Sequence, residues 1–471
     1  MQEKKDKCGV FGVWGAPNSA ELSYYALFAQ QHRGQESAGI AVTDRQELTA
    51  HVGMGLVGEV FNPRILRDLG GMAAIGHNRY STTGSSRACN AQPLLQEFSG
   101  GQVAIAHNGN LVNAGLLRKG FEEQGHIFHT TTDTEVIFHL LAAPNHAKKA
   151  DPLSAALQHL QGAYSLVILY KDRIEAVRDP WGFRPLVLGQ MPDGHYCVAS
   201  ESVALDAIGA NMIREVEAGE IVTLSDEGLK TRRYAERQKP AHCVFEHVYF
   251  ANPSSVVFGD TVQIVREKFG EQLAREAPVD ADFVMPMPDS GRSAALGYAR
   301  ASGLPLREGI VPNRYVGRTF IQPTQAQRMA AVQLKLNVVE EVVRGKRIVV
   351  VDDSIVRGTT TRGKMAQLRK AGAQEIHFRI SCPPIRHGCY FGVDFPDQSQ
   401  LIANNRTVKE IGEYLGVESL HFLSEDGMLA CVSQPETHYC TACYSGNYPI
   451  DVRQPLNKLD LERHQLKMFT A

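Results

Sequence analysis

The sequence predicts two folds in succession, a strand-rich α+β half followed by a doubly wound α/β half. Before about residue 235, short apolar runs alternate with Gly-rich turns, which is typical of layered sheets flanked by helices. After that point, single apolar strands alternate with helices, which is typical of a parallel sheet. The length of 471 residues is enough for two or three domains.

The elements expected in the first half are read from its apolar runs. Alternating or continuous apolar residues bounded by Gly and turn residues predict strands, and longer runs with apolar spacing of three and four predict helices. The strands are expected at residues 73–76, 102–107, 164–170, 196–200 and 220–224, and the helices at 20–32 and 133–143. In the second helix, Thr132 or Asp133 is the expected cap.

The second half is expected to follow a polar linker at residues 232–240. A strand at 282–287 ends in a Pro- and Gly-rich loop, and a nearly continuous β-branched run at 345–353 predicts a strand buried on both faces. A helix at 359–371 closed by Gly372 and a strand at 375–381 complete a β-α-β unit.

Composition excludes several classes of protein. The formal net charge of −2 gives no bulk electrostatic reason to bind nucleic acid or an anionic membrane. No apolar run reaches the ~18–20 residues that a bilayer span needs, and residues 1–7 are charged and lack the apolar segment of a secretory signal. A cytoplasmic protein with neither of these partners is therefore expected. Its nine cysteines form an odd, scattered set unsuited to a disulfide framework.

The segment 349–360 gives the sharpest local signal. A buried strand ends in Asp352 and Asp353, and a short Ser/Gly/Thr loop then opens a helix. Ligands of open α/β sheets bind at the carboxyl ends of strands, and a helix N-terminus with free backbone amides suits a phosphate. The two acids suit sugar hydroxyls or Mg²⁺. The alternative is that these acids only cap the helix.

This segment resembles the phosphoribosyl-diphosphate (PRPP) motif of type I phosphoribosyltransferases. The resemblance implies that Asp352 and Asp353 face the ribose hydroxyls, and that an earlier loop at 286–292 holds the diphosphate through Ser290 and Gly291. It also implies one Mg²⁺ per subunit at Ser290, Asp352 and Asp353. The 5′-phosphate contacts that it implies are Ser354, Arg357, Gly358, Thr359 and Thr360.

A lid is expected between these two motifs. Residues 313–328 carry three arginines without strong periodicity, Arg314, Arg318 and Arg328, and Arg318 is the one expected to contact PRPP. Such a lid would exclude water and hold the charged leaving group. An ordinary solvated surface is the alternative for these arginines.

A cysteine near the N-terminus lies in an apolar, Gly-containing strand. Taken alone, Cys8 is typical of a core residue. Four polar, Gly-rich segments downstream change that interpretation, because together they offer an arginine, an acid, a side-chain amide and flexible backbone amides. These groups can hold the carboxylate and amino group of an amino acid and a developing oxyanion. The segments are residues 31–39, 76–84, 106–110 and 130–135.

The set resembles the class II glutamine amidotransferase domain, an N-terminal-nucleophile hydrolase of αββα architecture. The resemblance implies that residues 1–7 are a propeptide and that the freed amino group of Cys8 is the general base for its own thiol. It also implies glutamine contacts from Arg79, Asp133, Arg33 and Gly34, and an oxyanion hole at Asn108 and Gly109. His77 and His107 are then structural residues.

The two resemblances occur in one chain, in an order similar to that of the amidophosphoribosyltransferase family. The order implies a glutaminase domain at 8–235 and a phosphoribosyltransferase domain at 236–471. It implies a pentosyl transferase that uses glutamine and PRPP to make 5-phosphoribosylamine, glutamate and diphosphate, the first committed step of purine synthesis. Purine nucleotides as feedback inhibitors and a homotetramer are further implications.

Four cysteines are candidates for a metal site. A C-x₂-C pair with two remote cysteines can bind zinc or an iron–sulfur cluster, although the pair alone also has redox and structural uses. The family resemblance favours the propeptide-containing subfamily, with one structural [4Fe–4S] cluster per subunit. The ligands would be Cys243, Cys389, Cys440 and Cys443, and the remaining cysteines without an assigned role are Cys89, Cys197, Cys382 and Cys431. Of these four, Cys382 and Cys431 could lie near the cluster.

Two other functions stay open at this point. One is a glutamine-dependent synthase with a sugar-phosphate acceptor, which would need an isomerase domain in place of the segment 349–360. The other is a regulatory protein that senses PRPP or nucleotides and uses the cluster as a redox sensor.

Overall fold

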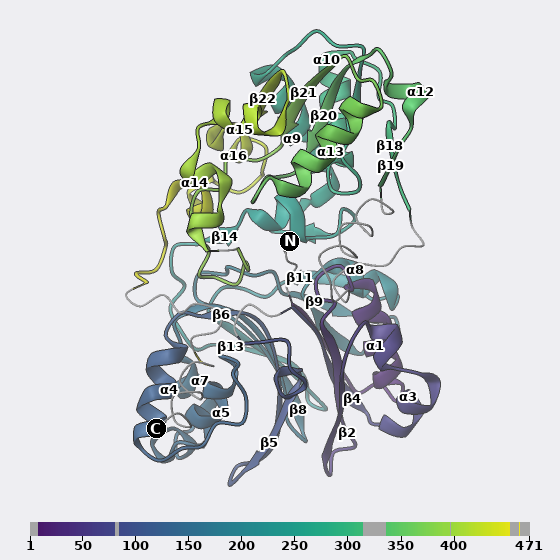
Figure 1. The fold of residues 1–471 in the computed structure, drawn as a ribbon. Helices are drawn as coiled ribbons and strands as arrows, with labels where there is room; N and C mark the ends of the chain where they lie inside the picture. Colours follow the sequence, from purple (N-terminus) through teal and green to yellow (C-terminus); the bar gives the residue numbers. More distant parts are fainter. Residues whose placement is uncertain (1–7, 81–83, 314–335, 396, 453–460, 462–471) are drawn as a thin grey trace.

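The chain folds into two halves that meet along one side (Figure 1). The computed structural model describes residues 8–80, 84–313, 336–395, 397–452 and 461. The N-terminal half contains two antiparallel sheets and the C-terminal half a parallel sheet, so the predicted α+β and α/β division is confirmed. Within the described ranges, no helix combines the length and apolar composition that crossing a membrane requires.

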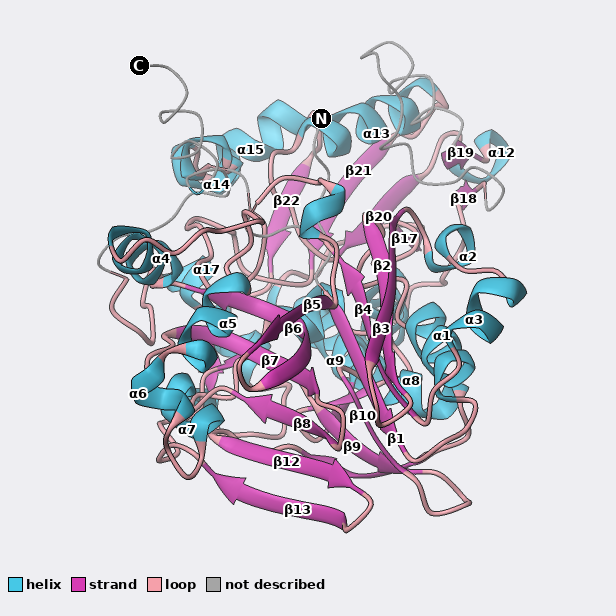
Figure 2. Cartoon of the chain, turned by 90° about the horizontal axis from the view of Figure 1, so that it is seen from below, coloured by secondary structure: helices cyan, strands magenta, loops and turns pink. Residues whose placement is uncertain are grey.

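The first sheet of the N-terminal half has seven strands in the order β11-β9-β10-β1-β4-β2-β3. Its strands are β1 (Gly9–Trp14), β2 (Ser37–Thr43), β3 (Leu48–Met54), β4 (Ala73–Arg79), β9 (Val187–Gln190), β10 (Tyr196–Ala199) and β11 (Asn211–Glu215). Helices lie along its outer face (Figure 2). They are α1 (Ser19–Ala29), α2 (Val57–Val60), α3 (Pro63–Leu69) and α8 (Ser202–Ala207).

The second sheet has six strands in the order β13-β12-β8-β7-β6-β5. Its strands are β5 (Leu94–Phe98), β6 (Gly101–Leu111), β7 (Gly162–Leu169), β8 (Arg173–Arg178), β12 (Glu220–Ser225) and β13 (Gly228–Arg233). The helices beside it are α4 (Ala114–Glu123), α5 (Glu135–Ala142), α6 (Pro144–Ala147) and α7 (Pro152–Leu157), and a short 3₁₀ turn, η1 (Ala88–Asn90), precedes β5.

The two sheets face each other across an apolar core. Val10 and Ile75 of the first sheet pack in one cluster with Val167 and Val222 of the second. Separate clusters join each sheet to its own helices. This is the αββα layering that the family resemblance implies, and it places the N-terminal end of β1 beside the C-terminal end of β4.

The C-terminal half is built on a parallel sheet in the order β17-β20-β21-β22. The strands are β17 (Phe283–Pro286), β20 (Arg347–Asp352), β21 (Glu375–Ile380) and β22 (Ser419–Phe422). The helices are α9 (Val262–Glu276), α10 (Arg292–Ser302), α12 (Glu340–Val343), α13 (Thr359–Lys370), α14 (Ile402–Asn405), α15 (Val408–Leu415), α16 (Glu425–Leu429) and α17 (Ala442–Ser445). One cluster of buried residues from these elements forms the core of this half.

Short paired segments complete the C-terminal half. They are β14 (His242–Cys243) with β23 (Tyr439–Cys440), β15 (Val256–Val257) with β16 (Asp260–Thr261), and β18 (Ile310–Pro312) with β19 (Leu336–Val338). A π-helical turn, η2 (Glu246–Phe250), follows β14, and 3₁₀ turns lie at η4 (Gln398–Gln400) and η5 (Glu436–His438).

The expected linker at 232–240 begins inside a sheet. Arg232 and Arg233 pair with Ile221 and Glu220 on β12, so both belong to the edge strand β13. A charged strand at a sheet edge looks like a linker in sequence, because its outer side needs no apolar partner.

Candidate functional site: a buried cysteine and a strand-end acidic pair

Cys8 lies immediately before β1 and is buried, with 8% of its surface exposed. Its Sγ donates to the carbonyl of Tyr80, the residue after β4, at 3.3 Å. Burial raises the pKa of the thiol to about 11, while the positive charge of Arg79 opposes that shift and the charges of Glu36 and Asp133 add to it. The fold therefore gathers a cysteine, a cation and two acids that are far apart in sequence.

Two of these charged groups suit the ends of an amino acid. Arg79 ends β4, is almost fully buried, and its Nη1 lies 3.8 Å from a carboxylate oxygen of Glu36. Asp133 accepts a hydrogen bond from the backbone N–H of Leu111 at 2.9 Å. The expectation that Asp133 or Thr132 caps the following helix is wrong, because α5 begins at Glu135 and its N-cap residue makes no side-chain capping bond.

Asn108 and Gly109 lie together on β6, in register with Ser165 and Tyr164 of β7. The Asn108 side chain is 1% exposed, and its Nδ2 has no hydrogen-bond partner among the described residues. A side chain on Gly109 would begin 2.0 Å from the carbonyl oxygen of Ala163. A buried donor without an acceptor costs free energy unless a ligand supplies one, which suits a developing oxyanion.

Arg33 and Gly34, both expected to line the glutamine site, lie against the backbone of Cys8 and of β4. A Cβ on Gly34 would lie 2.7 Å from the backbone of Asn78 and 2.8 Å from that of Arg79, so this glycine lets the loop pack against β4. The guanidinium of Arg33 is enclosed by the carboxylates of Glu201 and Glu246, and its Nε donates to the carbonyl of Cys8 at 3.0 Å. Arg33 thus holds the backbone of the cysteine, and its Nη1 and Nη2 atoms both donate to buried carboxylates.

His77 and His107 are structural in their contacts. A ring nitrogen of His77 bonds to the carbonyl of His107 at 3.0 Å, and burial lowers the pKa of His77 to about 3. Burial also lowers the pKa of His107, whose Nδ1 faces Thr134 at 3.1 Å. Both imidazoles are therefore neutral near pH 7 and sit in fixed hydrogen bonds.

A second set of polar residues lies at the carboxyl edge of the parallel sheet. Pro286 of β17 is in register with Val351 of β20, which brings the loop after β17 beside the acidic pair. Ser290 Oγ donates to one oxygen of Asp353 at 2.6 Å, and Ser354 Oγ donates to the other at 2.5 Å. A Cβ on Gly291 would lie 2.3 Å from the carbonyl of Val351.

The expected phosphate loop connects β20 to α13. Gly358 is the N-cap residue of α13 with φ +75°, a conformation that favours glycine, and Thr359 and Thr360 form the first turn. The chain thus presents the N-terminus of a 12-residue helix next to Asp352 and Asp353. Arg357 lies in the same loop, near Asp394. The expected lid arginines Arg314, Arg318 and Arg328 lie outside the described residues.

Four cysteines converge where the two halves meet. Cys243 and Cys440 are direct neighbours on the paired strands β14 and β23. The carbonyl of Cys443 accepts the backbone N–H groups of Arg386 and His387, which draws in the loop that carries Cys389. Burial, reinforced by the other three cysteines, holds the pKa of Cys443 well above its usual range.

Among the described residues, no three His, Cys, Asp or Glu side chains are close enough to ligate one metal ion. Of the unassigned cysteines, Cys382 faces Cys443 and Tyr444, whereas Cys431 bonds to Gly427 and has lysine and arginine neighbours instead.

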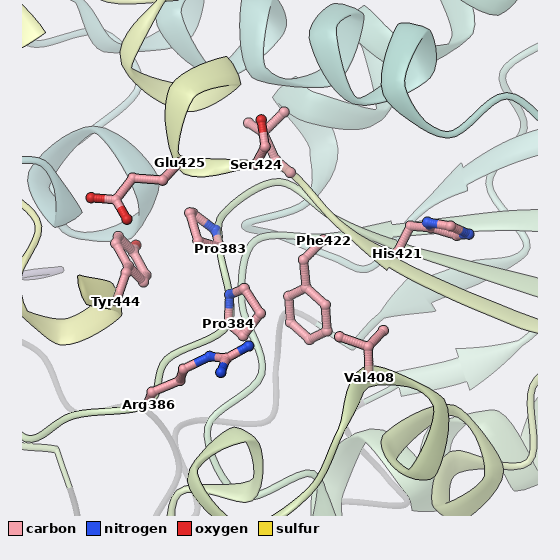
Figure 3. Close-up of a pocket in the computed structure, with 10 residues that line it drawn as sticks. Pro383, Pro384, Arg386, Val408, His421, Phe422, Ser424, Glu425 and Tyr444 are labelled. Atoms are coloured by element: carbon pink, nitrogen blue, oxygen red, sulfur yellow. The ribbon is translucent and has the colours of Figure 1, made fainter. Parts of the chain in front are cut away.

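A separate cavity of about 370 Å³ lies at the carboxyl ends of β21 and β22. Figure 3 shows Arg386, Glu425 and Tyr444 around it, with Pro383 and Pro384 from the segment after β21. It is therefore distinct from the acidic pair at the end of β20.

Comparisons with known proteins agree with both halves. Residues 77–207 match the glutamine amidotransferase domain family. The chain is 46% identical over 454 residues to the amidophosphoribosyltransferase of Bacillus subtilis (strain 168), covering 95% of each chain. The chain belongs to the amidophosphoribosyltransferase family. A chloroplastic amidophosphoribosyltransferase from Glycine max is 48% identical over 451 residues, covering 96% of this chain and 79% of the relative.

A solved amidophosphoribosyltransferase structure extends the agreement to three dimensions. It is glutamine PRPP amidotransferase from B. subtilis complexed with ADP and GMP, with a TM-score of 0.90 and 45% identity. The alignment covers 96% of this chain and 99% of the B. subtilis chain. This likeness also decides against the synthase with an isomerase domain, because the parallel-sheet half belongs to the matched fold.

Three buried residues near the cysteine were missed in the sequence. They are Arg184, Glu201 and Glu246, each fully buried and bound to Arg33 or to one another. The available signal was weak: a charged residue inside an apolar segment, as at Glu246 between Phe245 and Val248, indicates a buried ion pair but not its partner.

Proposed function

We propose that the protein converts glutamine and PRPP into 5-phosphoribosylamine, glutamate and diphosphate, with Cys8 as the nucleophile. The observation that carries this proposal is that both polar sites lie in one chain that aligns along nearly its whole length with amidophosphoribosyltransferases. We further propose that residues 1–7 are a propeptide, 8–235 the glutaminase domain and 236–471 the phosphoribosyltransferase domain.

Glutamine hydrolysis would begin with the amino group that cleavage after residue 7 exposes on Cys8. That amine, with a pKa of ~7.7–8.0, takes the thiol proton, and the thiolate attacks the carboxamide carbon. Asn108 and Gly109 stabilise the oxyanion, the proton passes to the departing nitrogen, and ammonia leaves a thioester. Water then releases glutamate and restores the thiol. The raised pKa of the Cys8 thiol supports the need for such a base.

Arg79 and Asp133 would bind the α-carboxylate and α-amino group of glutamine, and Gly34 would line the same site. Their charges have the required signs, and both act on the thiol of Cys8, so they lie around the reacting atom. Both are nearly fully buried, which strengthens their attraction for a zwitterion. Arg33 is proposed instead to position Cys8.

Ribosylation would take place at the carboxyl edge of the parallel sheet. Ammonia attacks C1 of the ribose as diphosphate departs, with Asp352 and Asp353 on the ribose hydroxyls and Ser290 and Gly291 on the diphosphate. The loop residues proposed for the 5′-phosphate are Ser354, Arg357, Gly358, Thr359 and Thr360, and Arg318 is proposed as a further PRPP contact. The hydroxyl and carboxylate oxygens of Ser290, Asp352 and Asp353 suit Mg²⁺, which when bound neutralises charge on the leaving group.

We propose that Cys243, Cys389, Cys440 and Cys443 hold one structural [4Fe–4S] cluster. Four cysteines converge there beside Arg184, and thiolates are the ligands that such clusters use. The bound iron would supply the positive charge that keeps these buried thiols deprotonated.

The remaining proposals concern nucleotide ligands, oligomeric state and cellular location. The B. subtilis structure is complexed with ADP and GMP, and we propose that purine nucleotides bind this chain through the same phosphate loop. We also propose a cytoplasmic homotetramer that binds neither nucleic acid nor membrane.

The test of the main proposal separates the two half-reactions. Purified protein is assayed for PRPP-dependent product with glutamine and with ammonium, alongside N-terminal mass analysis. Cys8→Ala should abolish the glutamine-dependent reaction and preserve the ammonium-dependent one. Loss of both reactions, or full activity with Met1 retained, would refute the mechanism.

A further inference from the structure

Three charged side chains form a continuous buried chain between the proposed nucleophile and the C-terminal half. Arg33 Nε donates to the carbonyl of Cys8 at 3.0 Å, and its Nη1 and Nη2 donate to the carboxylate of Glu246 at 3.1 and 3.0 Å. Glu246 lies in η2, just after β14, and accepts from Arg184 Nη1 at 3.0 Å. The side chains of Arg33, Glu246 and Arg184 are all 0% exposed.

Arg184 continues this chain to a loop of the C-terminal half. Its Nε and Nη2 donate to the carbonyl of Phe391 at 3.1 and 2.6 Å. The ring of Phe391 stacks on Phe183, with centroids 4.4 Å apart. The loop at 389–392 is therefore held at Phe391, two residues after Cys389, which is proposed as a cluster ligand.

The far side of the same loop touches the proposed oxyanion hole. A Cβ on Gly392 would lie between 3.1 and 3.3 Å from the backbone of Gly109, and Gly392 has φ +98°. Asn110 Nδ2, one residue after Gly109, donates to the carbonyl of Tyr390 at 2.9 Å. The loop at 389–392 thus lies directly against β6 where Asn108 and Gly109 are placed.

Stability alone does not explain a buried series of ion pairs such as Arg33–Glu246–Arg184. Buried ion pairs lose hydration and often contribute no more than apolar residues of the same volume. They do fix geometry, because a guanidinium binds a carboxylate and a carbonyl only in defined directions. Here the two fixed points are the backbone of Cys8 and the loop beside Gly109, which are the two sides of one reaction site.

We propose that Arg184 is a positioning residue for glutamine hydrolysis. It holds the 389–392 loop against the oxyanion side and, through Glu246 and Arg33, fixes the backbone of Cys8. The geometry of the glutaminase site is therefore completed by a loop from the other half of the chain. This inference rests on the proposed function, since it needs Cys8 to be the nucleophile.

The test compares Arg184→Lys with the matched variant Arg178→Lys in the full chain. Lysine keeps the charge but lacks the planar fork that directs separate N–H groups of Arg184 to Glu246 and to the Phe391 carbonyl. Arg178 is a buried arginine, 3% exposed, that donates to the carbonyls of Val216 and Gly182 and to the carboxylate of Glu215 instead. Arg184→Lys should lower kcat for glutamine hydrolysis by about 30- to 100-fold, since a displacement of ~1 Å can cost that much. KM for glutamine and ammonium-dependent synthesis should stay within about threefold, because neither uses the misplaced atoms.

A second variant tests the same loop without changing a charge. Gly392→Ala places a methyl group against Gly109 at an unfavourable φ, so it should also lower glutamine kcat while ammonium-dependent synthesis persists. The labelling rate of Cys8 by a glutamine-like diazoketone should fall in both variants and not in Arg178→Lys.

The outcomes distinguish the inference from the function on which it rests. If Arg184→Lys and Gly392→Ala retain glutamine kcat and Cys8 labelling within about threefold of the wild-type values, the positioning role is wrong. Equal losses of glutamine- and ammonium-dependent reactions would also overturn it, because they indicate general damage to the fold. If the wild-type protein shows no glutamine-dependent reaction, the proposed function itself fails.

Discussion

The unpaired amide of Asn108 leads to a prediction that separates catalysis from stability. Replacing Asn108 with leucine keeps the branching of the side chain at Cγ and removes the Nδ2 donor that has no partner among the described residues. If this donor stabilises the oxyanion, its loss affects only the transition state of glutamine hydrolysis. The substrate carboxylate and amino group would still be held by Arg79 and Asp133.

The expected size of the effect follows from similar donors. Loss of one oxyanion-hole donor lowers kcat by about 10²- to 10³-fold, which corresponds to about 2.7–4 kcal/mol. A buried donor without an acceptor costs about 1–3 kcal/mol in the folded state, so its replacement by an apolar side chain should leave stability unchanged or higher. Most core substitutions do the opposite, because they destabilise the fold and reduce activity only indirectly.

The assay measures kcat and KM for glutamine, ammonium-dependent synthesis and the thermal unfolding temperature of Asn108→Leu. The matched control is Asn78→Leu, which is equally buried on β4 but donates to the carbonyl of Leu27 at 2.7 Å. The control should lose stability and keep most of its glutamine kcat. A folded Asn108→Leu protein whose kcat stays within about threefold of wild type would refute the oxyanion role.

Three further predictions concern the other proposed groups. In protein that retains residues 1–7, Cys8 should be alkylated slowly at pH 8, and the rate should rise toward pH 11 because the pKa of this thiol is about 11. The exposed Cys89 should react faster than Cys8 at pH 8. Peptide mass mapping measures both rates, and equal rates would contradict the prediction. Asp353→Asn should lower ammonium-dependent synthesis by about two orders of magnitude, because several kcal/mol of charge stabilisation are removed, and should leave glutamine hydrolysis intact; unchanged synthesis would exclude the proposed ribose and metal role. Cys440→Ser should lose visible absorption and unfold at a lower temperature, whereas Cys431→Ser should keep the absorption; a Cys440→Ser protein that keeps its absorption would exclude the cluster assignment.

The fold was predictable where the residues of a single strand or helix form a recognisable pattern. The β-branched run at 345–353 predicted a strand buried on both faces, which is β20, and the pattern after Gly358 predicted the helix that α13 begins at Thr359. The edge strand β13 was misread as a linker because charged residues are tolerated on an edge. Asp133 was misread as a cap because the sequence does not show that its carboxylate accepts the N–H of Leu111, 22 residues earlier.

The candidate site was predictable only where residues share a short segment. Asp352 and Asp353 belong to one continuous motif, and the structure places Ser290 beside them through the pairing of β17 with β20. Arg33 shows the limit of this reasoning, because its carboxylate partners lie 168 and 213 residues further along the chain. Its segment is polar and Gly-rich like a substrate loop, and nothing in the sequence indicates that its guanidinium faces inward.

The orientation of Arg33 changes how the two halves depend on each other. A substrate-binding arginine would make the glutaminase site complete within the first domain, and the second domain would be joined to it only by the chain. The guanidinium of Arg33, which holds the Cys8 carbonyl, is neutralised by the carboxylate of Glu246. Glu246 belongs to η2, which lies beyond the expected domain boundary. An isolated first domain would leave this buried arginine with Glu201 alone and would expose Gly109 where Gly392 now packs. If Cys8 is the nucleophile as proposed, this arrangement would make glutamine hydrolysis depend on the assembled chain, where the released ammonia can be used.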